Sequence, residues 1–64
     1  MGLSRAETVA QNAAREWLQE EITEEVALSL IASILGISML FAERLLLNAA
    51  DKLTRPQNLG GTNA

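Results

Sequence analysis

A stretch of seventeen residues without a charge, residues 26–42, constrains the fold of this chain more than any other feature. If these residues form a helix, their large apolar side chains point in nearly every direction, Leu28 and Ile31 to one side and Ile34 and Phe41 to others. A helix that is apolar on almost all sides must be surrounded by other protein or by lipid. The rest of a 64-residue chain is too short to surround it alone. The sequence therefore predicts that this segment is buried against a partner or in a bilayer.

Residues 23–55 are predicted to form one long apolar helix. Pro56 disfavours helix at Arg55, so this helix should end there. Residues 26–42 would rise about 26 Å as a helix, a little less than the roughly 30 Å hydrocarbon core of a bilayer. Extension to about residue 47 lengthens the apolar segment but places Glu43 and Arg44 near one boundary. We therefore predict a single membrane span over about residues 26–47. The alternative is a soluble helix buried by several neighbours, which the absence of Trp or Tyr at the far boundary favours.

The distribution of charge predicts an orientation for such a span. Basic residues near it lie on its C-terminal side, at Arg44, Lys52 and Arg55, whereas a run of glutamates precedes it. Lys and Arg are enriched in cytoplasmic segments. We expect a single-pass membrane protein with its C-terminus in the cytoplasm, or, in the alternative, a cytoplasmic soluble oligomer.

Residues 1–22 predict an acidic, amphipathic helix. Ser4 and Glu7 have the spacing of a capping box, in which each side chain bonds to the backbone N–H of the other residue. The apolar face of this helix consists mostly of alanine, which allows a partner to approach closely. Its members are Ala6, Val9, Ala10, Ala13, Ala14 and Trp17. A helix that lies on a membrane surface usually has larger apolar side chains and a basic polar face. We therefore expect this helix to pack on protein, with Trp17, Val9 and Ala13 as the partner-facing anchors. Trp17 at a membrane interface is the alternative.

Six residues, 20–25, join the two predicted helices. Glu20 and Glu24, and likewise Glu21 and Glu25, are like charges four residues apart, which disfavours a continuous helix slightly. If Thr23 caps a new helix, the two glutamates after it interact favourably with the helix dipole. The joint is expected to bend, although the helix propensity of Glu also allows a continuous helix.

One stripe of the apolar segment contains only small residues. Its members are Ser29, Ala32, Ser33 and Gly36. In membranes, such stripes allow helix backbones to approach closely. We expect a helix–helix contact there; the alternative is that small residues coincide by chance in a segment so rich in Ser and Ala.

Composition excludes several classes of function. The sequence has no Cys and no His, so disulfides and the usual zinc ligands are absent. Residues 1–25 carry six acidic and two basic side chains, a net charge of −4, which argues against nucleic acid as a partner. The glutamates of residues 20–25 point in different directions around a helix, and we expect them to be solvated rather than to bind a metal. No nucleophile, base or cofactor motif is present, so we predict no catalytic residues, no cofactor and no small-molecule substrate. Residues 56–64 are polar and contain glycine, which predicts a flexible tail.

The sequence as a whole predicts an all-α protein: a short amphipathic helix, one long apolar helix and a disordered tail. The predicted function is that of a non-enzymatic, single-span structural or accessory subunit of a helical assembly. Its partners would be protein helices, either its own copies or a larger membrane complex, together with lipid. The alternative is a soluble all-helical homo-oligomerisation module or a coat-type self-assembling subunit. In either case we do not expect a stable dilute monomer, because one short helix cannot cover the apolar segment.

Overall fold

The computed structural model describes residues 4–55, and these residues form three helices and no strand. The helices are α1 (Arg5–Leu18), α2 (Glu24–Leu35) and α3 (Met39–Thr54). The all-helical prediction is confirmed for this part of the chain. The predicted tail, residues 56–64, lies outside the described residues.

The prediction of one long helix over residues 23–55 is wrong, because α2 ends at a left-handed glycine. Gly36 has φ 68° and ψ 40°, a conformation that residues with a Cβ rarely adopt. The backbone N–H groups of Gly36 and Ile37 both donate to the carbonyl oxygen of Ala32, at 2.8 and 3.1 Å. These bonds satisfy a carbonyl at the helix terminus, as helix-ending glycines commonly do.

A serine two residues later starts the next helix. The Ser38 side chain accepts a hydrogen bond from the backbone N–H of Phe41 at 3.2 Å, and Ser38 itself is extended (φ −71°, ψ 159°). This is the geometry of a helix N-cap. The apolar run therefore contains both a stop signal and a start signal, and it folds into two helices instead of one.

The turn changes the membrane prediction. Within residues 4–55, no single helix has both the length and the apolar character needed to cross a bilayer. Helices α2 and α3 meet that test only when taken together, and they are bent by 111° at their junction. The span predicted over about residues 26–47 is therefore not one straight helix.

The N-terminal half follows the expected capping pattern. Both bonds of the predicted capping box are present: the Glu7 N–H donates to the Ser4 hydroxyl oxygen (3.1 Å), and the Ser4 N–H to the Glu7 carboxylate (3.3 Å). The joint is bent, because α1 ends at Leu18 and Glu20 adopts a positive φ of 63°. Thr23 then caps α2 by accepting the Val26 N–H at 3.2 Å.

The three helices share one small core, made largely of alanine. It is formed by Ala10, Ala13 and Ala14 of α1, Ala27 and Ile31 of α2, and Ala42, Leu46 and Ala49 of α3. Ile31 and Leu46 are its largest fully buried side chains. Because alanine adds little bulk, the helix backbones can approach closely, but the core buries little apolar area.

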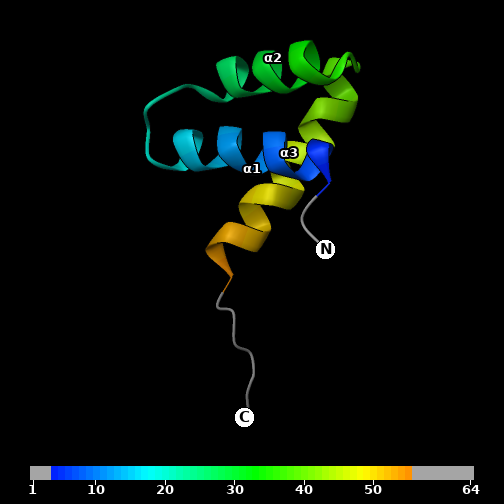
Figure 1. Cartoon of the computed structure of the whole chain (residues 1–64). Coiled ribbons are helices and arrows are strands. Elements are labelled where there is room, and N and C mark those ends of the chain that lie inside the picture. Colours follow the sequence, from blue (N-terminus) through cyan, green and yellow to red (C-terminus); the bar gives the residue numbers. More distant parts are fainter. Residues whose placement is uncertain (1–3, 56–64) are drawn as a thin grey trace.

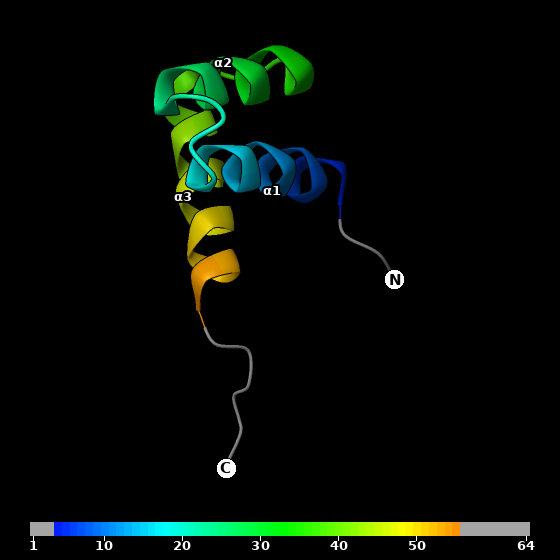
Figure 2. The same cartoon turned by 90° about the vertical axis from the view of Figure 1, so that its left-hand side faces the viewer.

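Helices α1 and α2 lie side by side and run in opposite directions, and α3 crosses α1 steeply and extends beyond it (Figure 1). The view turned by 90° shows the same arrangement, with α2 and α1 stacked along the upper part of α3 (Figure 2). The inner face of α3 is covered in this way, whereas its outer face has no helix packed on it in the described part of the chain.

Candidate interaction surface

The α2–α3 unit has the geometry of a helix–turn–helix. In that motif two helices meet at about 90–120° and are joined by a turn of three or four residues that often contains glycine. Here the angle is 111°, and the turn consists of the three residues between Leu35 and Met39, the first of which is Gly36. Helix α1 packs across both members of the unit. In residues 4–55, this arrangement covers one side of α3 and leaves the opposite side without a helix packed on it.

That free face is apolar, and we call it the α3 outer face. It consists of Leu40, Phe41, Arg44 and Leu47. The exposed fractions are 74% for Leu40, 55% for Phe41 and 49% for Leu47. Leu40, Arg44 and Leu47 are spaced four and three residues apart, so they lie along one side of the helix. Large apolar side chains gathered in this way on a small protein commonly mark a binding surface.

A shallow hollow lies at the N-terminal end of the α3 outer face. It has a volume of about 200 Å³ and is lined by Ser38, Leu40, Phe41 and Arg44. The aliphatic and aromatic walls favour an apolar side chain as its occupant, with the Arg44 guanidinium at its edge. The hollow and the exposed Leu47 lie on the same face, about two helical turns apart.

The charged residues beside this face have no ion-pair partner in residues 4–55. The ion pairs in that part of the chain are Lys52–Glu7 at 3.2 Å and Arg55–Asp51 at 3.0 Å. Glu43, which is half-buried, and Arg44, which is exposed, take part in neither of them. A partner that covers the α3 outer face therefore has one positive group on that face, Arg44, and one negative group beside it, Glu43, with which to pair.

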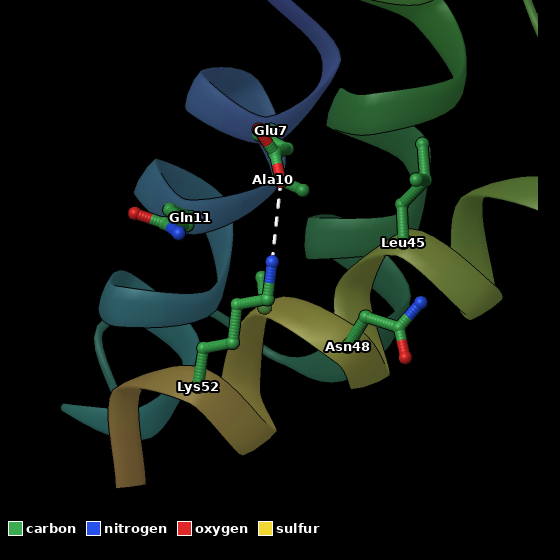
Figure 3. Close-up of a pocket in the computed structure, with 7 residues that line it drawn as sticks. Glu7, Ala10, Gln11, Leu45, Asn48 and Lys52 are labelled. Atoms are coloured by element: carbon green, nitrogen blue, oxygen red, sulfur yellow. Dashed lines mark hydrogen bonds and ion pairs between the residues drawn. The ribbon is translucent and has the colours of Figure 1, made fainter. Parts of the chain in front are cut away.

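The Lys52–Glu7 pair joins the start of α1 to the C-terminal half of α3, as Figure 3 shows. It borders a groove of about 140 Å³ whose floor includes Ala10 and Ala49. The hydrogen bond from Lys52, assisted by the bond from the Ser4 backbone N–H, lowers the pKa of the Glu7 carboxyl below its ordinary value of 4.5. Both members of the pair are exposed enough for solvent to screen them, so the pair orients the two helices and contributes little to stability.

The residues predicted as partner-facing anchors contact the chain's own core. Ala13 is buried, and Val9 and Trp17 are half-buried against the core cluster. In the described part of the chain, α1 therefore packs on α2 and α3 of the same chain. Val9 and Ala13 also line an open groove of about 190 Å³ against Leu30 and Ile34 of α2.

Of the small-residue stripe, only Ala32 packs against the chain's own core. Ser29, Ser33 and Gly36 are exposed, and only Ala32 is half-buried. Gly36 has a different role from the one predicted, because its left-handed backbone ends α2. A contact of this stripe with another chain stays a prediction.

The sequence interpretation missed the α3 outer face as a separate surface, because it placed these residues in a continuous span. The signal that identifies the surface was present: a glycine at a helix C-terminus followed by a serine as N-cap, Gly36 and Ser38, is a recognised stop and start pattern. The described residues contain no group of three or more acidic side chains positioned to hold a metal ion.

Comparison with known proteins does not assign this chain to a family. No family model, no curated protein and no solved structure matches it. The case for a function therefore depends on the geometry and chemistry of the chain's own residues.

Proposed function

We propose that this chain is a non-enzymatic helical interaction module that binds protein helices through the α3 outer face. The observation that carries the proposal is the exposure of Leu40, Phe41 and Leu47 on one side of α3. Such a module would act as a structural or accessory subunit of a helical assembly.

The size of the surface supports a protein partner. If a large side chain has a full area of roughly 200 Å², the three apolar side chains of this face together expose about 350 Å². An interface of standard size covers about 800 Å² per partner, a little over half of it apolar, so this face can supply most of the apolar area of such an interface. At about 25 cal/mol per Å², covering it gains on the order of 10 kcal/mol before the costs of association. That gain is large compared with the few kcal/mol of stability expected for so small a fold.

The grooves support a binding role over a catalytic one. The hollow on α3 and the two grooves along α1 have volumes of about 140 to 200 Å³. Sites for small ligands are usually cavities of about 300 to 1,000 Å³ with convergent polar groups. The charged residues that line them are the Glu7–Lys52 ion pair in one groove, Glu16 in the second and Arg44 in the third, so no two unpaired charged groups converge in any of them.

DNA binding is a second candidate function, and the 111° helix–turn–helix geometry is the observation that favours it. In DNA-binding examples the first residues of the second helix contact bases, and the first helix crosses the phosphate backbone. Here the start of α3 presents Met39, Leu40 and Phe41, and the first turn of α2 carries Glu24 and Glu25. Glutamates at a phosphate-facing position would repel DNA. We therefore place this candidate second.

The single-span membrane interpretation becomes less favourable than its soluble alternative. A straight span would require Gly36 to adopt a helical backbone and α1 to separate from α2 and α3. Separation would remove Ile31 and Leu46 from the core that they share with α1. We favour the helical oligomerisation module, and lipid binding is a separate outcome of the test below.

Site-specific photo-crosslinking tests the proposal. Phe41 is replaced by p-benzoylphenylalanine, which preserves an aromatic ring at that position, and the cells that produce the protein are irradiated. We expect covalent adducts with protein from the Phe41 probe, and few from the same probe at the exposed polar residue Gln19. Equal yields from both positions, or adducts with lipid instead of protein, would overturn the proposal.

A binding titration separates the second candidate. Fluorescence anisotropy of a labelled DNA duplex is measured with increasing concentrations of the purified chain at low and at moderate salt. The proposal expects no binding beyond background. Saturable binding that weakens as salt increases would favour the DNA interpretation.

A further inference from the structure

We infer that this chain forms a two-fold symmetric dimer by exchanging α1, so that the α1 helix of each copy packs on α2 and α3 of the other copy. The exchange requires that the bent joint between Leu18 and Glu24 straightens into a helix continuous with α1 and α2. The inference goes beyond the proposed function and does not depend on the α3 outer face, which stays uncovered in both forms.

The joint is bent by a backbone conformation that its residues do not favour. Glu20 has a positive φ of 63°. The backbone N–H groups of Glu20 and Glu21 donate to the carbonyl oxygens of Trp17 and Glu16, both at 2.9 Å, which is the hydrogen-bond pattern of a Schellman motif. Glycine usually occupies the left-handed position of that motif, because a residue with a Cβ is strained there. In this chain the position is occupied by a glutamate, which is a good helix former.

The sequence of the joint is compatible with a continuous helix. Residues 19–23 contain neither glycine nor proline, and three of the five are Gln or Glu, which favour helix. Two effects oppose the straight form: Thr23 would no longer cap α2, and glutamates four residues apart would repel one another. Straightening releases the strain at Glu20 in both copies. Because the opposing effects are each small, the two forms are close in free energy and concentration decides between them.

An opened chain needs a helix with the properties of α1 to complete its core. Helix α1 supplies three of the buried alanines and contacts both of the other helices. When α1 is carried away from α2, Ile31 and Leu46 lose the helix that covers them. The α1 helix of a second opened copy fits this gap, because it makes the contacts that are already present within one chain.

The arrangement of the helices allows the exchange to close after two copies. Helices α1 and α2 lie side by side and run in opposite directions (Figure 1). A straight joint therefore directs α1 away from α2 of its own chain. Two such long helices packed antiparallel place each α1 beside the other copy's α2, and both copies use the same surfaces. Exchange of an identical element is a low-cost route to a dimer, and strained hinges promote it.

A distance measured within one chain tests the exchange directly. The sequence has no cysteine, so Asn12→Cys and Ile34→Cys introduce a single pair of sites for spin labels. Both positions line the groove between α1 and α2, and packed helices lie about 8–10 Å apart, so in the closed chain the labels lie within about 20 Å. In a continuous helix the two positions are about 33 Å apart, at about 1.5 Å per residue. Labelled chains are refolded from urea with an excess of unlabelled chain, and double electron–electron resonance of the dimer should show the longer distance.

Two substitutions at Glu20 should shift the equilibrium in opposite directions. Glu20→Gly removes the strain of the bent joint and weakens the straight helix, so it should weaken the dimer at least about 10-fold in sedimentation velocity. Glu20→Ala keeps the strain, removes like-charge repulsion and favours helix, so it should strengthen the dimer at least about 3-fold. Ser33→Ala, at an exposed position that is helical in both forms, is the control and should leave dimerisation unchanged. Circular dichroism shows whether each variant keeps its helices.

Three outcomes overturn the inference. The first is a purified chain that stays monomeric at several hundred micromolar, and the second is a dimer that responds equally to Glu20→Gly and Glu20→Ala. The third is a dimer whose labels stay within about 20 Å, because its chains are then still closed. None of these outcomes changes the crosslinking expected at Phe41, so failure of the exchange is distinguishable from failure of the proposed function.

Discussion

Substitution of Gly36 by alanine gives opposite results for the two ways in which the apolar run can fold. In the structure, Gly36 has φ 68°, which costs an alanine about 1–2 kcal/mol. No atom lies within 4 Å of a Cβ added there, so the cost comes from the backbone conformation and not from a steric clash. In one continuous helix the same substitution would stabilise by about 1 kcal/mol, because alanine is a far better helix former than glycine.

The magnitude is easily measured for a chain of this size. A change of 1 kcal/mol moves the midpoint of thermal unfolding by roughly 4–8 °C in a domain of 60–100 residues. Gly36→Ala should therefore lower Tm by several degrees or more, whereas a continuous helix predicts a rise of several degrees. The measurement is unfolding by heat and by urea, followed by circular dichroism at one fixed protein concentration.

Gly36→Asn is the matched control, because asparagine tolerates the left-handed conformation better than alanine does. We expect the order of stability Gly36, then Asn, then Ala. An alanine variant as stable as the unmodified chain, or more stable, would refute the turn at Gly36 and restore the single long helix.

Three further predictions follow from the packing, the caps and the ion pair. Ile31→Ala should lower the free energy of unfolding by about 2–5 kcal/mol, measured with urea, because Ile31 is fully buried. Ile34→Ala, at a half-exposed position in the same helix, should lower it by less than about 1 kcal/mol, and similar losses for the two variants would contradict the assigned core. Ser38→Ala should cost about 1 kcal/mol by the same measurement, and no loss would mean that this cap does not start α3. The lowered pKa of Glu7 means that its bond with Lys52 adds stability above about pH 4.5, which is lost as pH falls through the lower folded value. Lys52→Gln should raise the Glu7 pKa towards 4.5 in an NMR titration, and an unchanged pKa would show that the pair is absent in solution.

Local signals in the sequence predicted much of the fold. Three of these signals depend only on residues within about three positions along the chain: the capping box at Ser4, the cap at Thr23 and the end of the last helix before Pro56. The structure has each of them. Arg55 is extended (φ −77°, ψ 145°), as a residue before proline prefers to be. The alanine-rich face of the first helix packs in the structure on α2 and α3 of the same chain, and its contact with a partner stays a prediction.

The candidate site was harder to predict, because it is defined by what α1 leaves uncovered. Leu40 and Leu46 are the same residue type in one helix, yet Leu40 is the most exposed large apolar side chain and Leu46 is fully buried. Periodicity within a single helix cannot distinguish them when nearly every direction is apolar. Only the position of α1 across α3 makes the distinction.

The sequence by itself determined that residues 26–42 must be surrounded, and it supplied both a stop and a start signal within them. It did not determine whether the chain uses those signals. Two conformations are available to these residues: a left-handed Gly36 followed by a Ser38 cap, or a continuous helix. Their local free energies differ by only about 1 kcal/mol, since the cap and the helix bonds offset each other. The tertiary structure decided the outcome, because the turn brings Ile31 and Leu46 together beneath α1, and burying each such side chain is worth about 1.5–3 kcal/mol.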